Sequence, residues 1–302
     1  MLVVMTMVGC TPKPFKPNFV HTYNRIQPKA VVINGHQLIY TVTGEGPPII
    51  LLHGFGAQGW MWEYQQEALA HHFSVYTLDI LGYGYSDRPN IAYTPDLFVN
   101  SVKGFMSKLD IDQATLIGNS LGAGIAMGMA LKYPHLTDSI VLIGGFPQRV
   151  KEKVSLPSYR AFLRFKPEFL LRIGFSLSGK RLLRSTLESL VVDKSLITND
   201  VINRAYQFRT FSGSAHSLFS TRNNLQQWEE HYAPLISEIE TPTLILWGTD
   251  DPLFPLPVGE ELHHQIQNSS FLPIKNAGHL PMWEKPKETN LSIIKFLLPT
   301  DS

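Results

Sequence analysis

The sequence predicts an α/β fold in which helices cover a mostly parallel, open β-sheet. Short runs of apolar and β-branched residues recur along the chain, and such runs are typical of strands buried on both faces of a sheet. Helix-length segments such as residues 97–109 and 121–131 separate most of these runs. Because strands that alternate with helices form parallel sheets, the pattern predicts this fold class. A chain of 302 residues, 44% of them hydrophobic, can bury such a core.

The expected strands begin with a hairpin. β-Rich runs at residues 30–35 and 37–42 flank Asn34-Gly35, and Asn-Gly favours a two-residue hairpin turn. Six further strand runs follow: residues 48–52, 73–78, 114–117, 139–143, 243–247 and 270–274.

One long interval interrupts the alternation. No strand-like run occurs between residues 143 and 243, where amphipathic stretches are found instead. They are residues 158–165, 182–192, 199–208 and 216–228. We therefore predict a leader and Pro/Lys tether (1–28), an α/β core (29–148 and 233–302) and an inserted helical cap (149–232).

The N-terminal sequence predicts a protein that a lipid anchors to a membrane. Residues 1–8 are apolar apart from Thr6, which is too short a run to cross a bilayer, since a span needs about 20 residues. Met7-Val8-Gly9-Cys10, at the end of this run, resembles a bacterial lipobox, in which the cysteine is lipidated. We expect a cell-envelope lipoprotein anchored through Cys10. No basic residue precedes the apolar run, as a signal peptide would require, so a cytoplasmic protein with an apolar leader is the alternative.

Composition excludes several classes of partner. The 26 basic and 25 acidic residues nearly balance, so no nucleic-acid partner is expected. A single cysteine allows neither an intramolecular disulfide nor a cysteine-based metal site. The sequence implies no metal and no organic cofactor.

The strongest chemical motif is Gly118-Asn119-Ser120-Leu121-Gly122, which matches the G-x-S-x-G nucleophile elbow. It follows a strand run and opens a helix of small residues. A sharp turn of this kind exposes the serine hydroxyl and leaves no space for side chains at the two glycines. We therefore predict Ser120 as a nucleophile.

A serine hydroxyl needs a base, and the base needs a carboxylate. His279 follows the run 270–274, so it is expected at the carboxyl end of a parallel strand, where such sheets place their chemistry. Asp250 and Asp251 follow the run 243–247 and are both candidates for the acid.

Acyl transfer also needs donors for the oxyanion. His53-Gly54-Phe55-Gly56 follows the run 48–52. By position, the backbone N–H groups of Phe55 and of Leu121 are the expected donors.

These motifs, over residues 29–298, resemble the α/β-hydrolase superfamily in its serine-nucleophile branch with a helical cap. Residues 79–86 fit the D-x-x-G-x-G-x-S loop of that branch. The resemblance implies an α/β-hydrolase fold and the chain order Ser, Asp, His. It also favours Asp251 over Asp250, because Gly248, Asp251 and Pro255 match the G-x-x-D-x-x-x-P loop. Epoxide hydrolases and haloalkane dehalogenases share the scaffold but use an aspartate nucleophile, which Ser120 argues against.

Two further sequence features concern the substrate pocket and the surface of the predicted cap. The residues expected to line an apolar pocket are Trp60, Asn119, Phe146 and Trp283. Residues 149–184 carry ten Lys and Arg against two Glu. Such a basic cap face is either a solvated surface or a surface for anionic lipid headgroups.

The predicted function is hydrolysis of carboxylic esters of small to medium apolar substrates through an acyl-enzyme. One alternative is a C–C bond hydrolase of dienoic ring-fission products. Asn119 before Ser120 resembles the motif of those enzymes, but their longer glycine-proline oxyanion loop is absent here. The other is a receptor-like hydrolase with slow turnover.

Overall fold

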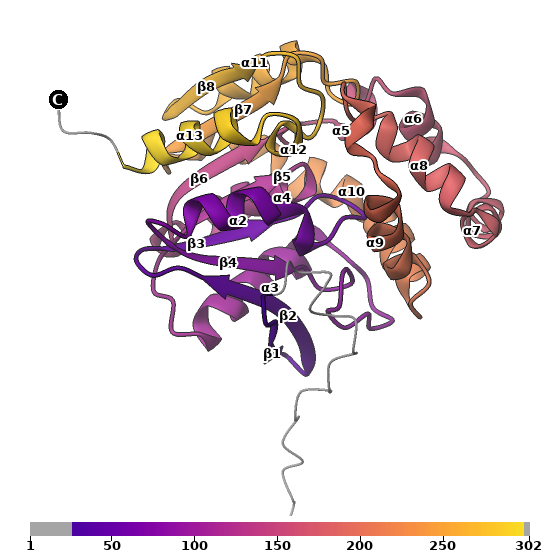
Figure 1. Ribbon diagram of the computed structural model, residues 1–302, viewed down its shortest axis with the longest axis horizontal. Helices are drawn as coiled ribbons and strands as arrows, with labels where there is room; N and C mark the ends of the chain where they lie inside the picture. The colour runs from indigo at the N-terminus through magenta and orange to yellow at the C-terminus, as the bar shows by residue number, and fades with distance from the viewer. Residues whose placement is uncertain (1–25, 299–302) are drawn as a thin grey trace, which may run out of the picture.

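The computed structural model describes residues 26–298, and its centre is an eight-stranded β-sheet (Figure 1). The strands are β1 (Lys29–Ile33), β2 (His36–Thr43), β3 (Pro48–Leu52), β4 (Ser74–Asp79), β5 (Ala114–Asn119), β6 (Thr137–Ile143), β7 (Thr243–Gly248) and β8 (Ser269–Ile274). Their order in the sheet is β1-β2-β4-β3-β5-β6-β7-β8. The pairs β1–β2 and β2–β4 are antiparallel and all the others are parallel, which confirms the predicted fold class.

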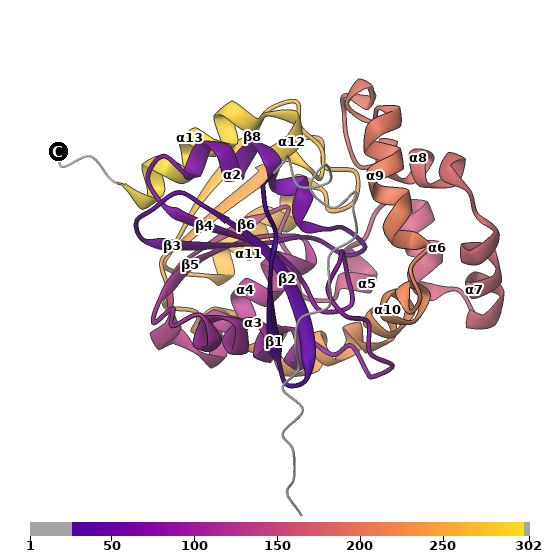
Figure 2. The same ribbon diagram turned by 60° about the horizontal axis from the view of Figure 1, so that its bottom comes forward.

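Helices cover both faces of the sheet (Figure 2). Outside the long interval, the α-helices are α2 (Glu63–Leu69), α3 (Pro95–Lys108), α4 (Leu121–Lys132), α11 (Leu256–Gln265), α12 (Pro281–Glu284) and α13 (Pro286–Leu297), and the 3₁₀ helices are η1 (Gly59–Trp62) and η2 (Pro134–Leu136).

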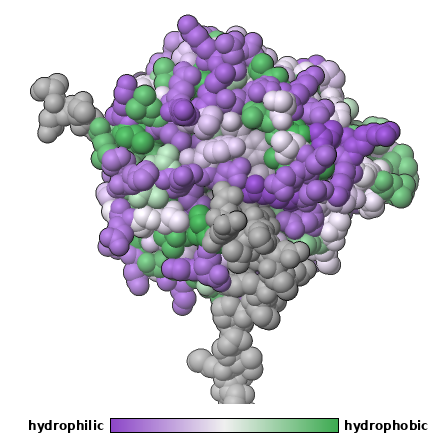
Figure 3. Space-filling view, viewed as in Figure 1, coloured by the Kyte–Doolittle hydropathy of each residue, from purple (hydrophilic) through white to green (hydrophobic). Residues whose placement is uncertain are grey.

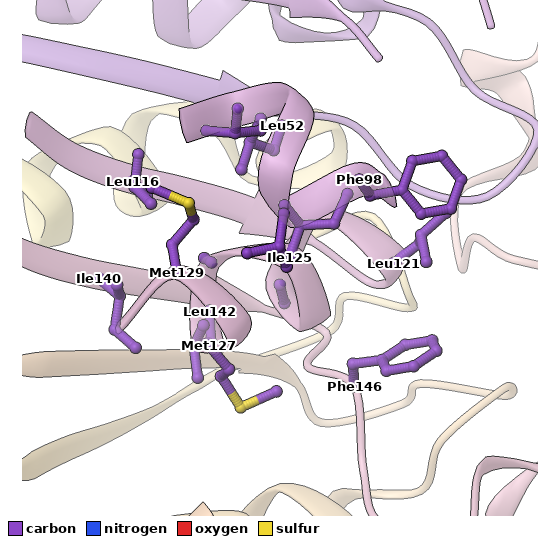
Figure 4. Close-up of a cluster of buried hydrophobic side chains, with 14 of the residues drawn as sticks. Leu52, Phe98, Leu116, Leu121, Ile125, Met127, Met129, Ile140, Leu142 and Phe146 are labelled. Atoms are coloured by element: carbon purple, nitrogen blue, oxygen red, sulfur yellow. The ribbon is translucent and has the colours of Figure 1, made fainter. Parts of the chain in front are cut away.

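Two buried layers result from the alternation of side chains along the strands. Ile50 and Leu52 of β3 pack in the layer that contains α3 and α4. Ile49 and Leu51 pack in the other, against α2 and α13. Figure 4 shows part of the first layer, where helix α4 covers strands β5 and β6. Its labelled side chains include Leu116, Ile125, Met127, Met129, Ile140 and Leu142.

The N-terminal hairpin has the predicted turn. Ile33 pairs with His36, which leaves Asn34 and Gly35 as the two turn residues. Both have positive φ, 50° and 81°. Such a turn requires this conformation, and Asn and Gly adopt it most readily.

The interval between β6 and β7 contains only helices. We call residues 149–232 the insert. It holds α5 (Val150–Lys153), α6 (Pro157–Arg164), α7 (Glu168–Leu177), α8 (Lys180–Glu188), η3 (Lys194–Leu196), α9 (Asn199–Arg209) and α10 (Ser214–His231), and η4 (Ala233–Glu238) follows. Both ribbon views place α6, α7, α8 and α9 together on one side of the sheet (Figures 1 and 2).

The structure corrects one strand expectation. The run 270–274 was expected to be buried on both faces, but β8 lies at the sheet edge and only Ile274 of it is buried. Pro273 is compatible with this position, because an edge strand tolerates the missing N–H.

Other predictions stay untested. Cys10 and the rest of residues 1–25 lie outside the described range. Within residues 26–298, none of the helices combines the length and apolar character needed to cross a membrane.

Candidate active site

Ser120 occupies a sharp turn between β5 and α4. Its φ is 52° and its ψ is −115°, a backbone conformation that is strained for a residue with a Cβ. Its N–H donates to the carbonyl of Ile143 at the end of β6, 3.1 Å away. The turn therefore places the serine side chain at the carboxyl edge of the parallel strands.

The two flanking glycines are sterically required. A Cβ on Gly118 would lie 2.2 Å from the backbone carbon of Gly122, and one on Gly122 would lie 2.0 Å from the carbonyl oxygen of Leu52. These distances are shorter than van der Waals contact. The close approach of β3, β5 and α4 at this point thus explains the G-x-S-x-G pattern.

His279 and Asp251 form a buried pair. Nδ1 of His279 lies 2.8 Å from Oδ2 of Asp251, and the two side chains are 4% and 0% exposed. The other carboxylate oxygen, Oδ1, accepts the N–H groups of Leu253 and Phe254 at 2.8 and 3.0 Å. The carboxylate is therefore held by the backbone on one side and holds the imidazole on the other.

The second ring nitrogen of His279 has no partner. Nε2 is buried and makes no hydrogen bond with any of the residues that the structure describes. Buried polar atoms are usually satisfied, and an exception indicates a role. If Nδ1 carries the proton that Asp251 accepts, Nε2 presents a free lone pair.

Asp250, the alternative acid, has a different setting. It is exposed, and its Oδ2 accepts the hydroxyl of Thr249 at 2.7 Å. The structure pairs His279 with Asp251 instead.

The predicted oxyanion donors flank Ser120. Leu121 is the first residue of α4, and the first N–H groups of a helix have no acceptor within it. Phe55 follows Gly54, whose missing Cβ would lie 3.4 Å from Cβ of Ser120. The turn after β3 therefore passes directly beside the serine side chain.

His53 is a structural residue of this turn. Its Nδ1 lies 2.9 Å from the Gly54 carbonyl oxygen, and its Nε2 accepts the N–H of Ile80 at 3.1 Å. Burial lowers the pKa of His53 to about 4, so the ring stays neutral at physiological pH. Nδ1 therefore holds the ring within its own turn, and Nε2 joins the ends of β3 and β4.

The loop after β4 is organised by Asp79. The carboxylate accepts the N–H of Gly59 at 2.8 Å and that of Tyr85 at 2.7 Å. Gly84 has φ 54°, and a Cβ there would lie 2.0 Å from the carboxylate carbon. The Ser86 hydroxyl donates to the Asp79 carbonyl and accepts the N–H of Ile39. The D-x-x-G-x-G-x-S residues thus fix the loop.

Of the expected pocket residues, only Phe146 lines the cavity beside Leu121. This cavity measures about 20 Å³, room for one water-sized group. Its lining is uncharged and mostly apolar: Tyr93, Pro95, Phe98, Val99, Leu121, Gly124, Ile125, Phe146, Thr221, Asn224, Leu225 and Trp228.

The other three pocket candidates do not line it. The Asn119 amide is buried and donates to the carbonyls of Ile143 and His279 at 3.0 and 3.2 Å, so it ties the nucleophile strand to the histidine loop. The Trp60 and Trp283 rings lie 5.3 Å apart and are buried against each other.

Glu284 is a residue that the sequence did not single out. Its carboxylate accepts the N–H of Gly278, beside His279, at 2.6 Å. It also accepts the N–H groups of Val192 and Asp193 in the insert, at 2.6 and 3.1 Å. Burial raises the pKa of Glu284, although these three donors oppose the shift.

The insert makes a second contact with the histidine loop. The N–H of His279 donates to the carbonyl of Leu190 at 2.8 Å. No local sequence pattern announces either contact, because both depend on where the insert returns to the core.

Comparisons with known proteins identify the family of the chain. The family model for the alpha/beta hydrolase fold matches residues 47–286. A 2-hydroxy-6-oxononadienedioate/2-hydroxy-6-oxononatrienedioate hydrolase from Paraburkholderia xenovorans is 30% identical over 270 residues, covering 86% of this chain and 90% of its own.

Solved structures show the same likeness. A meta-cleavage product hydrolase from Pseudomonas fluorescens is 27% identical with a TM-score of 0.77, covering 90% of this chain and 97% of its own. A bacterial membrane phospholipase A is 25% identical with a TM-score of 0.75, covering 90% and 86%. The chain is a hydrolase that belongs to the alpha/beta hydrolase fold family.

Proposed function

We propose that this protein is a serine hydrolase that cleaves a bond next to a carbonyl carbon. Ser120 is the nucleophile, His279 the general base and Asp251 the residue that orients His279. The observation that carries the proposal is the buried, unpartnered Nε2 of His279, whose Nδ1 is held by Asp251 at 2.8 Å. That lone pair can accept the Ser120 hydroxyl proton.

In this mechanism Ser120 Oγ attacks the carbonyl and its proton passes to Nε2. The oxyanion is stabilised by the N–H groups of Phe55 and Leu121. His279 then protonates the leaving group, and water attacks the acyl-enzyme with His279 again acting as base. We also propose that the insert is a cap over the strand ends.

The first candidate substrate is a dienoic ring-fission product cleaved at a C–C bond. The names of the Paraburkholderia relative and of the Pseudomonas structure support it, and this chain spans nearly all of both. Asn119 before Ser120, noted in the sequence, agrees with this candidate.

The second candidate is an uncharged carboxylic ester, the function predicted from the sequence; the small cavity beside Leu121 has an apolar lining that is compatible with it, although it has room for one water-sized group only. A dienoate carries a carboxylate, which a buried site would pair with a cation. None of the residues that line the cavity is charged. The guanidinium groups of half-buried Arg204 and buried Arg222 are each paired with a carboxylate, Glu63 at 3.0 Å and Glu168 at 3.4 Å.

One experiment separates these candidates. Purified protein is assayed with p-nitrophenyl esters of increasing chain length and, in parallel, with a vinylogous diketone dienoate followed by its absorbance. Loss of both activities in Ser120→Ala assigns them to this site, and the larger kcat/KM identifies the bond class. A single round of product release would instead favour the receptor-like alternative. Inactivity on both substrates, with no labelling of Ser120 by a fluorophosphonate, would overturn the proposal.

A further inference from the structure

Helix α7 turns an apolar face to solvent. Four of its side chains are exposed: Phe169 by 59%, Leu170 by 46%, Ile173 by 50% and Leu177 by 81%. Their spacing places them within about a third of the helix circumference. The inner face is also apolar, and its Phe175 packs on Phe219 of α10 at 6.0 Å.

Such an outer face is unusual for a helix of a globular protein, which normally exposes polar residues. Phe165 before α7 and Leu182 in α8 are exposed as well, by 42% and 54%. In Figure 3 an apolar area lies at the right edge, where Figure 1 places α7. We call these six residues the α7 patch, and contiguous patches of this kind mark interaction surfaces.

Exposed cations flank helix α7 in the sequence. Residues 149–184 contain ten Lys and Arg and two Glu. Lys166 precedes α7, and Lys180 and Arg181 follow it, all three exposed. None of the three pairs with a carboxylate in the part of the chain that the structure describes; Lys180 bonds to the Asn203 amide instead.

The patch is held rigidly on α10. Arg222, 2% exposed, donates to the carbonyls of Phe162 and Phe165 at 2.7 and 2.8 Å and pairs with Glu168. These bonds fix the junction of α6 and α7. The apolar side chains are therefore presented together.

We propose that the α7 patch and its flanking cations form a docking surface for an anionic lipid bilayer. The apolar side chains enter the boundary between headgroups and acyl chains, and Lys166, Lys180 and Arg181 contact lipid phosphates. Charge selects this occupant over a second copy, because two identical cationic faces repel each other. The surface involves neither Ser120 nor Cys10.

The test is flotation of full-length protein with vesicles of phosphatidylcholine, with and without phosphatidylglycerol. All proteins carry Cys10→Ala, so that no lipid anchor contributes. We expect binding to the anionic vesicles that weakens with added salt. Phe169→Ser and Leu177→Ser should each weaken it at least tenfold, because each removes several apolar carbon atoms from the inserted face.

Leu291→Ser is the matched control, because Leu291 is a 53% exposed leucine on α13, outside the insert. It should bind as the parent does, and so should Ser120→Ala, which separates this inference from the proposed hydrolysis. Melting temperatures verify that every variant is folded.

Three results would overturn the inference. The parent could fail to bind anionic vesicles, or Leu291→Ser could weaken binding as much as Leu177→Ser does. The third is a dimer, detected by sedimentation without lipid, that Leu177→Ser dissociates, because this would make a second copy the occupant.

Discussion

Replacing Asp251 with asparagine is the sharpest test of the catalytic geometry. In the wild type, Oδ1 of Asp251 accepts two backbone N–H groups and Oδ2 faces Nδ1 of His279. An asparagine has only one oxygen, and the two backbone donors require an acceptor. The amide oxygen is thus expected on the backbone side and the NH₂ group towards His279.

This orientation reverses the tautomer of the base. The NH₂ group donates to Nδ1, so the proton of the neutral imidazole moves to Nε2, which can no longer accept the Ser120 proton. The same change in a serine protease costs about 10⁴-fold in kcat. We expect a loss of that order here, which corresponds to about 5 kcal/mol of transition-state stabilisation.

The assay is steady-state hydrolysis of the best substrate from the ester and dienoate panel. Asp250→Asn is the control, because Asp250 is exposed and contacts Thr249 rather than His279. It should retain kcat within a few-fold. Similar losses from both variants, with melting temperatures unchanged, would refute the assignment of Asp251.

Three further variants test the site and its support. Ser120→Ala should lower kcat by on the order of 10⁴-fold or more and abolish stoichiometric fluorophosphonate labelling, and labelling that persists at another serine would contradict the nucleophile. Gly84→Ala should lower the melting temperature much more than Gly35→Ala, since both have positive φ but only the first places a Cβ against a carboxylate; equal shifts would show that φ alone matters. Burial raises the pKa of Glu284, so its carboxyl group keeps its proton to a higher pH in the folded protein than in the unfolded chain. The free energy of unfolding of the wild type should therefore fall as pH rises through the pKa that Glu284 has in the folded protein. Glu284→Gln should lack this slope in its melting temperature, whereas Glu288→Gln, which changes an exposed residue, should keep it.

The sheet could be predicted because its signals are local. The interior parallel strands contain runs rich in apolar and β-branched residues, and the Asn34-Gly35 turn is specified by two residues. Helix α7 was not among the predicted amphipathic stretches. It is only ten residues long, which leaves fewer than three turns over which a helical pattern can repeat. The edge position of β8 was also unpredictable, since strand order depends on contacts far apart in the sequence.

The candidate site likewise contains residues that could be predicted from the sequence and residues that could not. Ser120 and His279 could be named from the sequence, because each follows a strand and the parallel sheet brings those ends together. Position alone left Asp250 and Asp251 as candidates for the acid, and the family resemblance favoured Asp251. The backbone contacts of Asn119 and Glu284 could not. Each joins segments whose proximity is decided by the packing of the whole chain.

The insert helps to hold His279 in position, through its contacts with the Glu284 carboxylate and through the contact of Leu190 with His279. A hydrogen bond from Gly278 N–H holds the Glu284 carboxylate beside the histidine loop. Three further hydrogen bonds join the insert to the core here: those from Val192 and Asp193 N–H to the Glu284 carboxylate, and that from His279 N–H to the Leu190 carbonyl. At about 1 kcal/mol each, they resist separation of residues 190–193 from the histidine loop. The far end of the insert is fixed as well, because Arg222 joins the α6–α7 junction to α10. Exchanging the insert for that of a relative would therefore change the position of the base as well as the pocket, unless residues 190–193 were kept.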